Sequence, residues 1–353
     1  MSAIQQLFGG TRGVVVPANT VAPVVSGTAT VAQVLSCTTG SWSGPPTSYS
    51  YQWQQGTTNI SGATSSTYTI DPAYVGVTIR CVVTATNSLG STSANSNSTA
   101  AVSAITGQVA YTSPGTYSWT CPANVTSVSV VCVGPGSHTY AGGGLGWKNN
   151  ISVTPGNTYT VQVGQTSADE STTVKCSYFL SQATVRGNSG GNVGTTDGSP
   201  GSGGFLGTGG GNGGTTSSSQ GGGGAGGYAG NGGSGGSAYG GNGSAGAGGA
   251  GGGGAAYDDG ANFGSAPGGG VGLLGQGSSG TGGTKFTSAA NGGGGGSGGT
   301  AGGNTPPYSP ATVAGAYGGG GGGFGNTTTG AGAVRIIWPG TTRQFPSTNT
   351  TDM

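Results

Sequence analysis

Side chains that could support catalysis are scarce in this sequence. It contains a single histidine, His138, and seven carboxylates. No serine or cysteine has a plausible histidine partner in its sequence context, and a hydroxyl or thiol without an adjacent base is a weak nucleophile. A metal site would need several imidazole or carboxylate ligands. We therefore expect no enzyme activity, no metal and no cofactor.

Three local motifs have the residue types of a ligand site. Asp258 and Asp259 are adjacent and could hold Ca²⁺ in a loop, although adjacent acids alone are more typical of a solvated turn. Residues 270–275 (GVGLLG) match the dinucleotide-binding pattern, but neither a preceding strand nor a following helix is evident. In residues 142–148 (GGGLGWK), Trp147 disrupts the spacing of a phosphate-binding loop. None of the three predicts a cofactor site.

Composition and charge narrow the possible partners. Charged residues make up 4% of the chain, against about 25% in an average protein, and the net charge is +1. The basic residues are scattered, which argues against a nucleic-acid partner. No apolar stretch approaches the roughly 20 residues of a membrane span. Met1–Gly13 has no basic region followed by an apolar one, so we expect no signal peptide and no membrane insertion.

Short stretches of alternating polar and apolar residues predict an all-β protein with no significant α-helix. Residues 21–104 read as a β-sandwich. A cysteine on an early strand, Trp53 on a middle strand and a second cysteine on a late strand form the immunoglobulin arrangement, in which the indole packs on an inter-sheet bridge. Cys37 and Cys81 are the candidate structural disulfide. The other three cysteines are expected to be buried small hydrophobes.

A second β-rich domain is expected over residues 105–200. A last strand, 333–338, is too short to fold alone and should pair with the strands of this domain. The glycine-rich block, 201–330, would then leave one β-domain and return to it. Residues 331–353 form the closing strand and tail, and residues 1–20 form an N-terminal leader.

The glycine-rich block holds 59 of the 86 glycines and has a partial period of three. Ala225, Tyr228, Asn231, Ser234 and Ser237 are each three residues apart, which is the period of a polyproline II-type helix. Two glycine edges would let neighbouring backbones approach and hydrogen-bond. One interpretation is a packed bundle of polyglycine II helices. The other is a flexible glycine–serine coil, because ordered glycine loses much entropy.

Larger residues interrupt the glycine runs where a bundle would need turns. Exposed aromatic and polar groups in such clusters could recognise a sugar or a protein. Alternatively, they close the ends of a bundle that has no other hydrophobic core. The receptor-contact candidates are Phe205, Tyr239, Tyr257, Asp258, Asp259, Phe263, Leu273, Leu274, Phe286 and Tyr308.

Two resemblances follow from longer motifs. The stretches SGATSSTYTI, VTIRC and VTATNSLGSTSANS resemble the bacterial and phage Ig-like repeat of surface and tail proteins, although no tyrosine stands two residues before Cys81. Residues 107–348 are similar to glycine-rich proteins of tailed phages, cyanophages in particular. That similarity rests on TSPGTYSWTCPANVTSVSVVCVG, KNNISVTPGNTYTVQVG, VGLLGQG and GAVRIIWPGTTRQFPSTNT.

The glycine-rich block also resembles, in architecture, the distal adhesins of T-even-like phages, whose polyglycine II helices carry host-contacting tip loops. Those adhesins lack the Ig-like module and the flanking β-domain. The resemblances imply a structural virion protein of a bacteriophage, a tail fibre or receptor-binding adhesin, assembled in the host cytoplasm. Two alternatives remain, a head or neck decoration fibre and a bacterial surface adhesin or matrix protein.

The expected partners follow from these resemblances. Other virion proteins would bind the N-terminal region, and a host surface glycan or protein would bind the C-terminal part. We also expect a homo-oligomer, and tail fibres are commonly trimers. Fibrous assembly would cover strand edges that a small β-domain leaves open.

Overall fold

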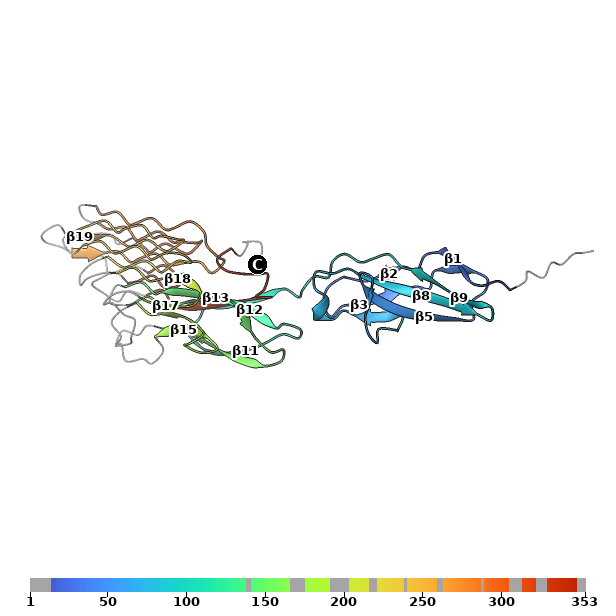
Figure 1. The fold of residues 1–353 in the computed structure, drawn as a ribbon. Coiled ribbons are helices and arrows are strands. Elements are labelled where there is room, and N and C mark those ends of the chain that lie inside the picture. Colours follow the sequence, from blue (N-terminus) through green and yellow to red (C-terminus); the bar gives the residue numbers. More distant parts are fainter. Residues whose placement is uncertain are drawn as a thin grey trace, which may run out of the picture. The chain divides into compact units, whose positions relative to one another are not determined.

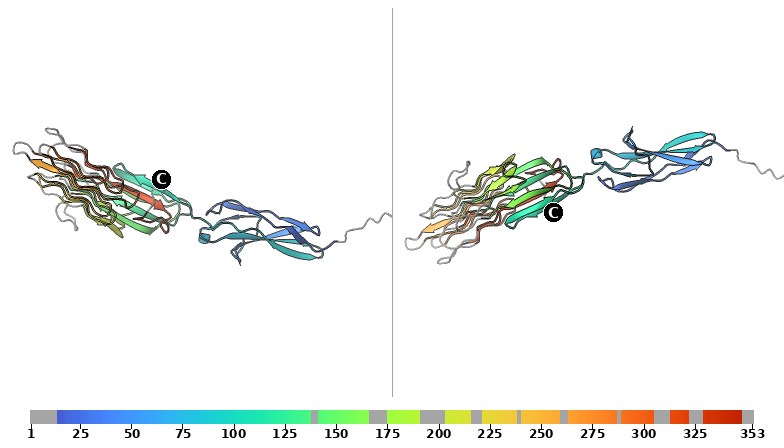
Figure 2. Two further views of the ribbon diagram at one scale, coloured as in Figure 1. Left: turned by 90° about the horizontal axis from the view of Figure 1, so that it is seen from above. Right: turned by 90° about the horizontal axis from the view of Figure 1, so that it is seen from below.

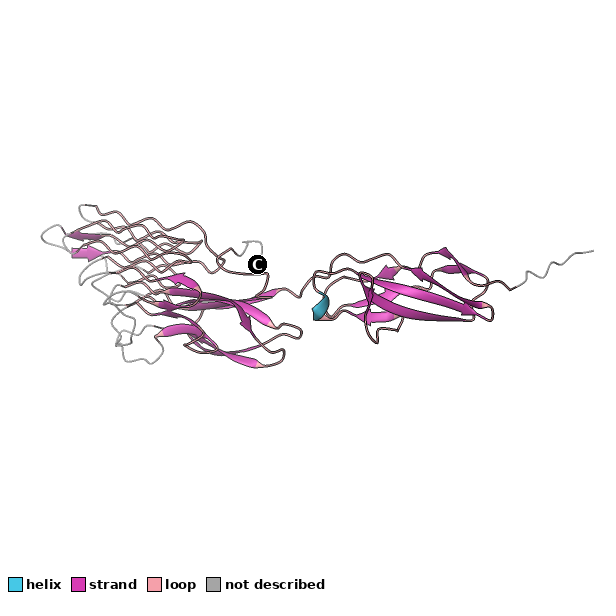
Figure 3. Ribbon diagram, in the orientation of Figure 1, coloured by secondary structure: helices cyan, strands magenta, loops and turns pink. Residues whose placement is uncertain are grey.

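The computed structural model describes residues 14–137, 141–165, 175–190, 203–215, 221–237, 240–258, 263–286, 289–304, 313–321 and 329–347. The chain divides into two compact units, Met1–Ile105 and Thr106–Met353, and each is treated by itself (Figure 1). Both are built from strands. Within the described residues, the one helical segment is a 3₁₀ turn at Pro72–Tyr74 (Figure 3). The expected all-β fold without significant α-helix is confirmed.

Two facing sheets enclose the core of the first unit. Its longest strand, β8 (Ile79–Asn87), alternates buried and half-buried side chains along its whole length, as a strand with one face on a core should. One sheet has the order β2 (Val25–Ser26), β3 (Val34–Cys37), β7 (Thr67–Thr69). The other has the order β6 (Thr58–Asn59), β5 (Ser48–Gln55), β8, β9 (Gly90–Asn95), and β1 (Ala18–Val21) pairs with β4 (Ser41–Ser43).

Trp53 lies at the centre of this core. Its side chain is fully buried, and its Nε1–H donates to the carbonyl oxygen of Ser65 at 2.9 Å. Cys37 and Cys81 reach the same core from opposite sheets. The residues thus occupy the expected Cys–Trp–Cys positions, while membership of the Ig-like family stays a prediction.

A second sandwich forms the base of the second unit. The sheet that we call the closing sheet has the order β10 (Gly107–Tyr111), β21 (Ala333–Trp338), β12 (Ser127–Val133), β13 (Leu145–Ser152), β18 (Gly209–Gly211). The facing sheet has the order β11 (Gly115–Thr120), β14 (Thr158–Val163), β15 (Cys176–Phe179), β16 (Val185–Asn188), β17 (Phe205–Leu206). The last strand therefore lies inside the closing sheet, between β10 and β12.

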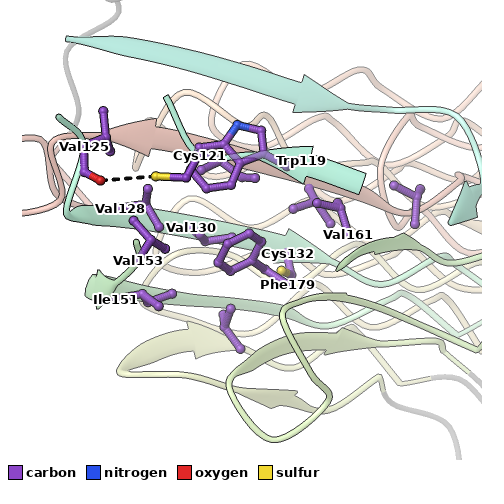
Figure 4. Packing of buried hydrophobic residues seen from close by; sticks show 14 residues of the cluster. Trp119, Cys121, Val125, Val128, Val130, Cys132, Ile151, Val153, Val161 and Phe179 are labelled. Carbon is purple, nitrogen blue, oxygen red and sulfur yellow. Dashed lines mark hydrogen bonds between the residues drawn. The ribbon is translucent and has the colours of Figure 1, made fainter. Parts of the chain in front are cut away.

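The core between these two sheets is made of valines, isoleucines and aromatic rings. Trp119 packs edge-on to Phe179, with ring centroids 5.9 Å apart, and the Cys121 thiol donates to the carbonyl oxygen of Val125 at 3.2 Å (Figure 4). The strand β21 contributes Val334 and Ile336 to this core. Its alternate residues Ala333 and Ile337 belong to a second cluster on the opposite face of the sheet. The closing sheet is therefore covered on both faces.

The cover on that opposite face is the glycine-rich block, which forms an ordered bundle of extended runs (Figures 1 and 2). Run 250–257 shows the packing. Its backbone hydrogen-bonds to different neighbours, for example from Gly254 N–H to Gly222 O at 2.8 Å and from Gly252 N–H to Gly294 O at 2.9 Å. The runs bonded to it are 221–227, 231–237, 241–246, 263–270, 277–283 and 290–296. Bonds to six surrounding runs distinguish this packing from a flat sheet, where a strand has two neighbours.

The predicted period of three appears directly in run 231–237. Asn231, Ser234 and Ser237 are exposed, whereas Gly233 and Gly236 are buried. Among the described glycines of the bundle, those with left-handed φ lie at turns, as Gly240 and Gly275 do. The runs themselves bond to several neighbours each, as expected of a polyglycine II bundle. The interpretation as a flexible coil is wrong for the described residues.

The boundaries expected at residues 200 and 330 do not separate structural units. Strands β17 and β18 lie inside the predicted glycine-rich block, yet each belongs to a sheet of the sandwich. Conversely, glycines at the ends of β12 and β13 join the bundle, as in the bond from Gly226 N–H to Gly143 O at 2.8 Å. Sandwich and bundle are continuous because backbone hydrogen bonds connect the runs of the bundle to the strand ends of the sandwich.

Candidate recognition site

The two ends of the bundle differ in the loops and turns that they contain. One, which we call the loop end, contains the hairpin β19 (Ala256–Asp258) and β20 (Phe263–Ser265), at the tip of the bundle in Figure 1. The other, which we call the turn end, contains the turns at residues 228–230, 247–249, 273–275, 297–298 and 316–318. A run of about seven residues between the ends spans roughly 20 Å at 3.1 Å per residue.

Charged and aromatic side chains gather at the loop end. The Lys285 ammonium donates to the carbonyl oxygen of Gly240 at 2.9 Å, and the Lys285 N–H donates to Asn242 Oδ1 at 2.8 Å. Gly240 has φ +83°, and a Cβ at this position would lie 3.3 Å from the Asp258 nitrogen. The next residue in the chain, Phe286, is 55% exposed. The Lys285 ammonium and the backbone of Asp258 therefore both lie beside Gly240, and an exposed ring follows Lys285 in the chain.

Tyr257 corrects one of the predicted contacts. Its side chain is only 4% exposed and packs with Ala255, Ala266 and Ala290. On the hairpin, Tyr257 pairs with Gly264, and the ring occupies the space that a side chain on Gly264 would need. It supports the hairpin from inside and cannot contact a receptor. For Tyr257, the alternative interpretation fits better, in which the larger residues close the end of the bundle.

The remaining candidates lie in four other situations. Phe205 is half-buried on β17, in the sandwich. Leu273 and Leu274 lie at the turn end, where Leu273 is buried against the closing sheet and Leu274 is half-buried. Phe263 lies on β20, but its side chain is outside the described part of the structure. Tyr239, Asp259 and Tyr308 lie outside the described residues. Of the described candidates, the loop end brings together Asp258 and Phe286.

Tyr228 fastens the turn end to the closing sheet. It is buried, its hydroxyl donates to Gly272 O at 3.2 Å, and the same hydroxyl accepts from Gly275 N–H at 3.1 Å. Its ring stacks on Phe345 with centroids 5.7 Å apart, and Trp147 Nε1–H donates to its carbonyl oxygen at 2.8 Å. Burial raises the pKa of Tyr228, so its hydroxyl stays a donor across the physiological range.

The predicted disulfide partners are neighbours but are not bonded to each other in this structure. Cys37 and Cys81 are both free, buried thiols. Burial, and then the adjacent Cys81 thiol, raise the pKa of Cys37 to about 12. Burial likewise raises the pKa of Cys81. Thiols with raised pKa values are poor nucleophiles at neutral pH, which gives this pair a packing role in the reduced protein.

A cleft at the turn end holds residues that were absent from the predicted site. Arg335, Gln108 and Tyr317 line it together with Leu273 and Leu274. Arg335 could have been noticed in the sequence, because it is a charged residue between apolar neighbours on a short closing strand. Tyr317 gives a different signal, because it is one of the larger residues that interrupt the glycine runs. The sequence alone does not define the turn that places it in the cleft.

The described residues contain no group of three or more potential metal ligands. Among them, no helix is long and apolar enough to cross a membrane. Comparison of the chain with known proteins finds no matching family model, no matching curated protein and no matching solved structure.

Proposed function

We propose that this chain is a structural virion protein of a bacteriophage, a tail fibre or receptor-binding adhesin that contacts the host surface through its loop end. The observation that carries the proposal is the contrast within the bundle. Its interior runs are almost pure glycine, whereas Asp258, Lys285 and Phe286 gather where the chain reverses. A rigid base with few side chains, presenting chemically varied loops, suits recognition.

The loop end favours binding over catalysis. The Lys285 ammonium is held by its hydrogen bond to Gly240 O, and the Lys285 backbone N–H is bonded to Asn242 Oδ1, which limits the entropy lost when the side chain meets a partner. Phe286 offers apolar area beside this cation. Aromatic and cationic side chains are common energetic centres of interfaces. The proposed ligand is a host surface glycan or protein.

The other regions have supporting roles in this proposal. The first unit acts as a spacer, and the N-terminal region attaches to other virion proteins. The assembled fibre is a homo-oligomer located in the virion. Its nearly neutral charge gives little electrostatic steering, so contact would depend on short-range packing.

A head or neck decoration fibre is the second candidate, because a β-sandwich such as the first unit suits that role equally well. Immunogold labelling of virions separates the two positions. Gold at the tail supports the adhesin, and gold on the capsid or neck supports decoration. Label confined to cell debris would remove both and favour a bacterial surface protein.

Adsorption competition tests the proposed contact. Purified full-length chain should bind host cells and slow phage adsorption in proportion to its concentration. The double variant Lys285→Ala, Phe286→Ala should lose at least ten-fold in competing potency, because the side chains at the loop end are removed. Leu89→Ala is the matched control, since Leu89 is 56% exposed in the first unit. Equal potency of all three proteins would contradict the assignment of the loop end.

A further inference from the structure

A cleft of about 540 Å³ lies at the turn end of the bundle, away from the loop end. One wall is the strand β10, an edge strand of the closing sheet. The other wall is formed by three turns of the bundle, at residues 272–274, 297–300 and 316–317. Its volume falls in the range of about 300–1,000 Å³ that is usual for small-ligand sites.

The backbone at two of these turns is unusual for the described part of the glycine-rich block. Described turns of the glycine-rich block place glycine at left-handed φ in several positions, yet Ser297 has φ +48° and Tyr317 has φ +57°. Both line the cleft. Such φ values disfavour bulky side chains, and residues held there gather at functional sites. The chain thus keeps side chains at two positions of the cleft where glycine would be easier to accommodate.

The two residues have different uses. Ser297 has a local role, because its hydroxyl donates to Gly249 O at 2.7 Å and accepts from Gly277 N–H at 3.0 Å. Tyr317 is half-buried, and among the described residues its hydroxyl has no hydrogen-bond partner. Local structure therefore explains Ser297 but leaves the tyrosine hydroxyl of the cleft unused.

Two nitrogen-bearing side chains, Arg335 and Gln108, line the cleft. Arg335 is 3% exposed, its Nη1 donates to Leu273 O at 2.8 Å, and its Nη2 donates to Gln108 Oε1. Because the Gln108 Oε1 accepts from Arg335, the NH₂ group of Gln108 is the part of its side chain that can donate to a ligand. Arg335 is the one charged side chain among the described lining residues. Leu273, Leu274 and Val109 supply apolar walls.

We infer that this cleft binds a carboxylated sugar, with the carboxylate near Arg335 and Gln108 and the ring against Tyr317 and Leu274. The positive charge of Arg335 is complementary to the carboxylate. The apolar walls and the tyrosine ring suit the C–H faces of a sugar ring, while the tyrosine hydroxyl can bond a ring oxygen or hydroxyl. The inference goes beyond the proposed function. It concerns a different end of the bundle and holds whether or not the loop end contacts a host.

Titration calorimetry on the full-length chain tests the inference. The probes are the methyl glycosides of glucuronic acid and N-acetylneuraminic acid, with methyl glucoside as the neutral control. At least one acidic glycoside should bind saturably, ten-fold or more tightly than the glucoside, and more weakly as salt rises. Absence of saturable binding, or equal binding of the neutral glycoside, overturns the inference.

Two pairs of variants locate the site. Leu274→Glu should abolish binding by adding a negative charge to the wall, whereas Leu274→Gln should bind within about three-fold of the original chain. Tyr317→Gly should lose at least ten-fold in affinity, and Tyr317→Phe, which keeps the packing, should lose several-fold. Binding that survives both Leu274→Glu and Tyr317→Phe lies elsewhere and overturns the inference. Phe286→Ala should leave sugar binding unchanged, so failure at the loop end and failure at the cleft can be told apart.

Discussion

Gly233 shows why single atoms matter in the bundle. A Cβ at Gly233 would lie 2.0 Å from the carbonyl oxygen of Ser244 and 2.6 Å from the nitrogen of Gly253. Both neighbours are backbone atoms of hydrogen-bonded runs, so neither can move without breaking bonds to the next run. The adjacent residue, Ser234, is exposed. Sequence neighbours in one run therefore differ completely in their tolerance of a side chain.

Gly233→Ala should lower the free energy of unfolding by about 1–3 kcal/mol, the usual range for overpacking a tight interior. Ser234→Ala, one residue away, should change it by less than about 0.5 kcal/mol, as exposed substitutions do. Denaturant unfolding followed by tryptophan fluorescence measures both, since one of the five indoles, that of Trp147, is bonded to Tyr228 of the bundle. Similar effects of the two substitutions would contradict packing on a bare glycine edge.

At the residue scale, the period of three predicted one common edge for Ala225, Tyr228, Asn231, Ser234 and Ser237. The last three are exposed on run 231–237, whereas Ala225 and Tyr228 are buried. The role of Tyr257 could not be predicted in the same way. An aromatic residue beside two acids looks like a surface cluster, and only pairing with Gly264 reveals that the ring is buried. Tyr317 was predicted to lie at a turn of the bundle but was not among the receptor-contact candidates, because neither its left-handed φ nor its place in the cleft can be predicted from composition.

Strand β21 links the sandwich to the bundle at the scale of elements. It pairs with β10 and β12, and its two faces enter different hydrophobic clusters. Ile336 is fully buried in the sandwich core. Because the strand closes the sheet only after the whole glycine-rich block has been traversed, the sheet and the bundle should depend on each other.

Ile336→Ala should lower the free energy of unfolding of the second unit by about 2–5 kcal/mol, the range for deleting a buried aliphatic side chain. Thermal unfolding monitored by circular dichroism, with limited proteolysis of the bundle, measures the loss. Val313→Ala is the control, because Val313 is 67% exposed and should be neutral. A bundle that kept its protease resistance while the sandwich was destabilised would show that the two are independent.

The closing strand was predicted at the residues where it is found. Its side chains alternate, and it is too short to fold alone, so it had to pair with other strands. The covering of the closing sheet by the bundle was not predicted. Glycine runs have no apolar face to indicate what they pack against, and the contact depends on a few residues such as Tyr228 and Phe345. The limits of the block were also missed, because glycine forms both the sheet edge at β18 and the runs beside it.

For the molecule as a whole, the main question is what replaces a conventional core. Much of the second unit buries peptide groups bonded to each other, and its apolar clusters lie mainly in and against the sandwich. Exposing apolar surface on unfolding raises the heat capacity by about 0.45 cal/K/mol/Å², whereas exposing polar surface lowers it by about 0.26. A protein stabilised mainly by buried peptide groups should therefore have a different heat-capacity change of unfolding from an average protein of equal length.

The heat-capacity change of unfolding should therefore fall below the usual value of about 12–15 cal/mol/K per residue. Scanning calorimetry of the full-length chain gives this change from the difference between the native and unfolded baselines, which needs no assumption of a two-state transition. Ser234→Ala serves as a control, because it alters neither the buried peptide groups nor the apolar clusters. A value at or above the usual range would mean that apolar burial dominates after all. A low value would identify backbone hydrogen bonding as the main source of order in the bundle, consistent with a rigid support for chemically varied loops.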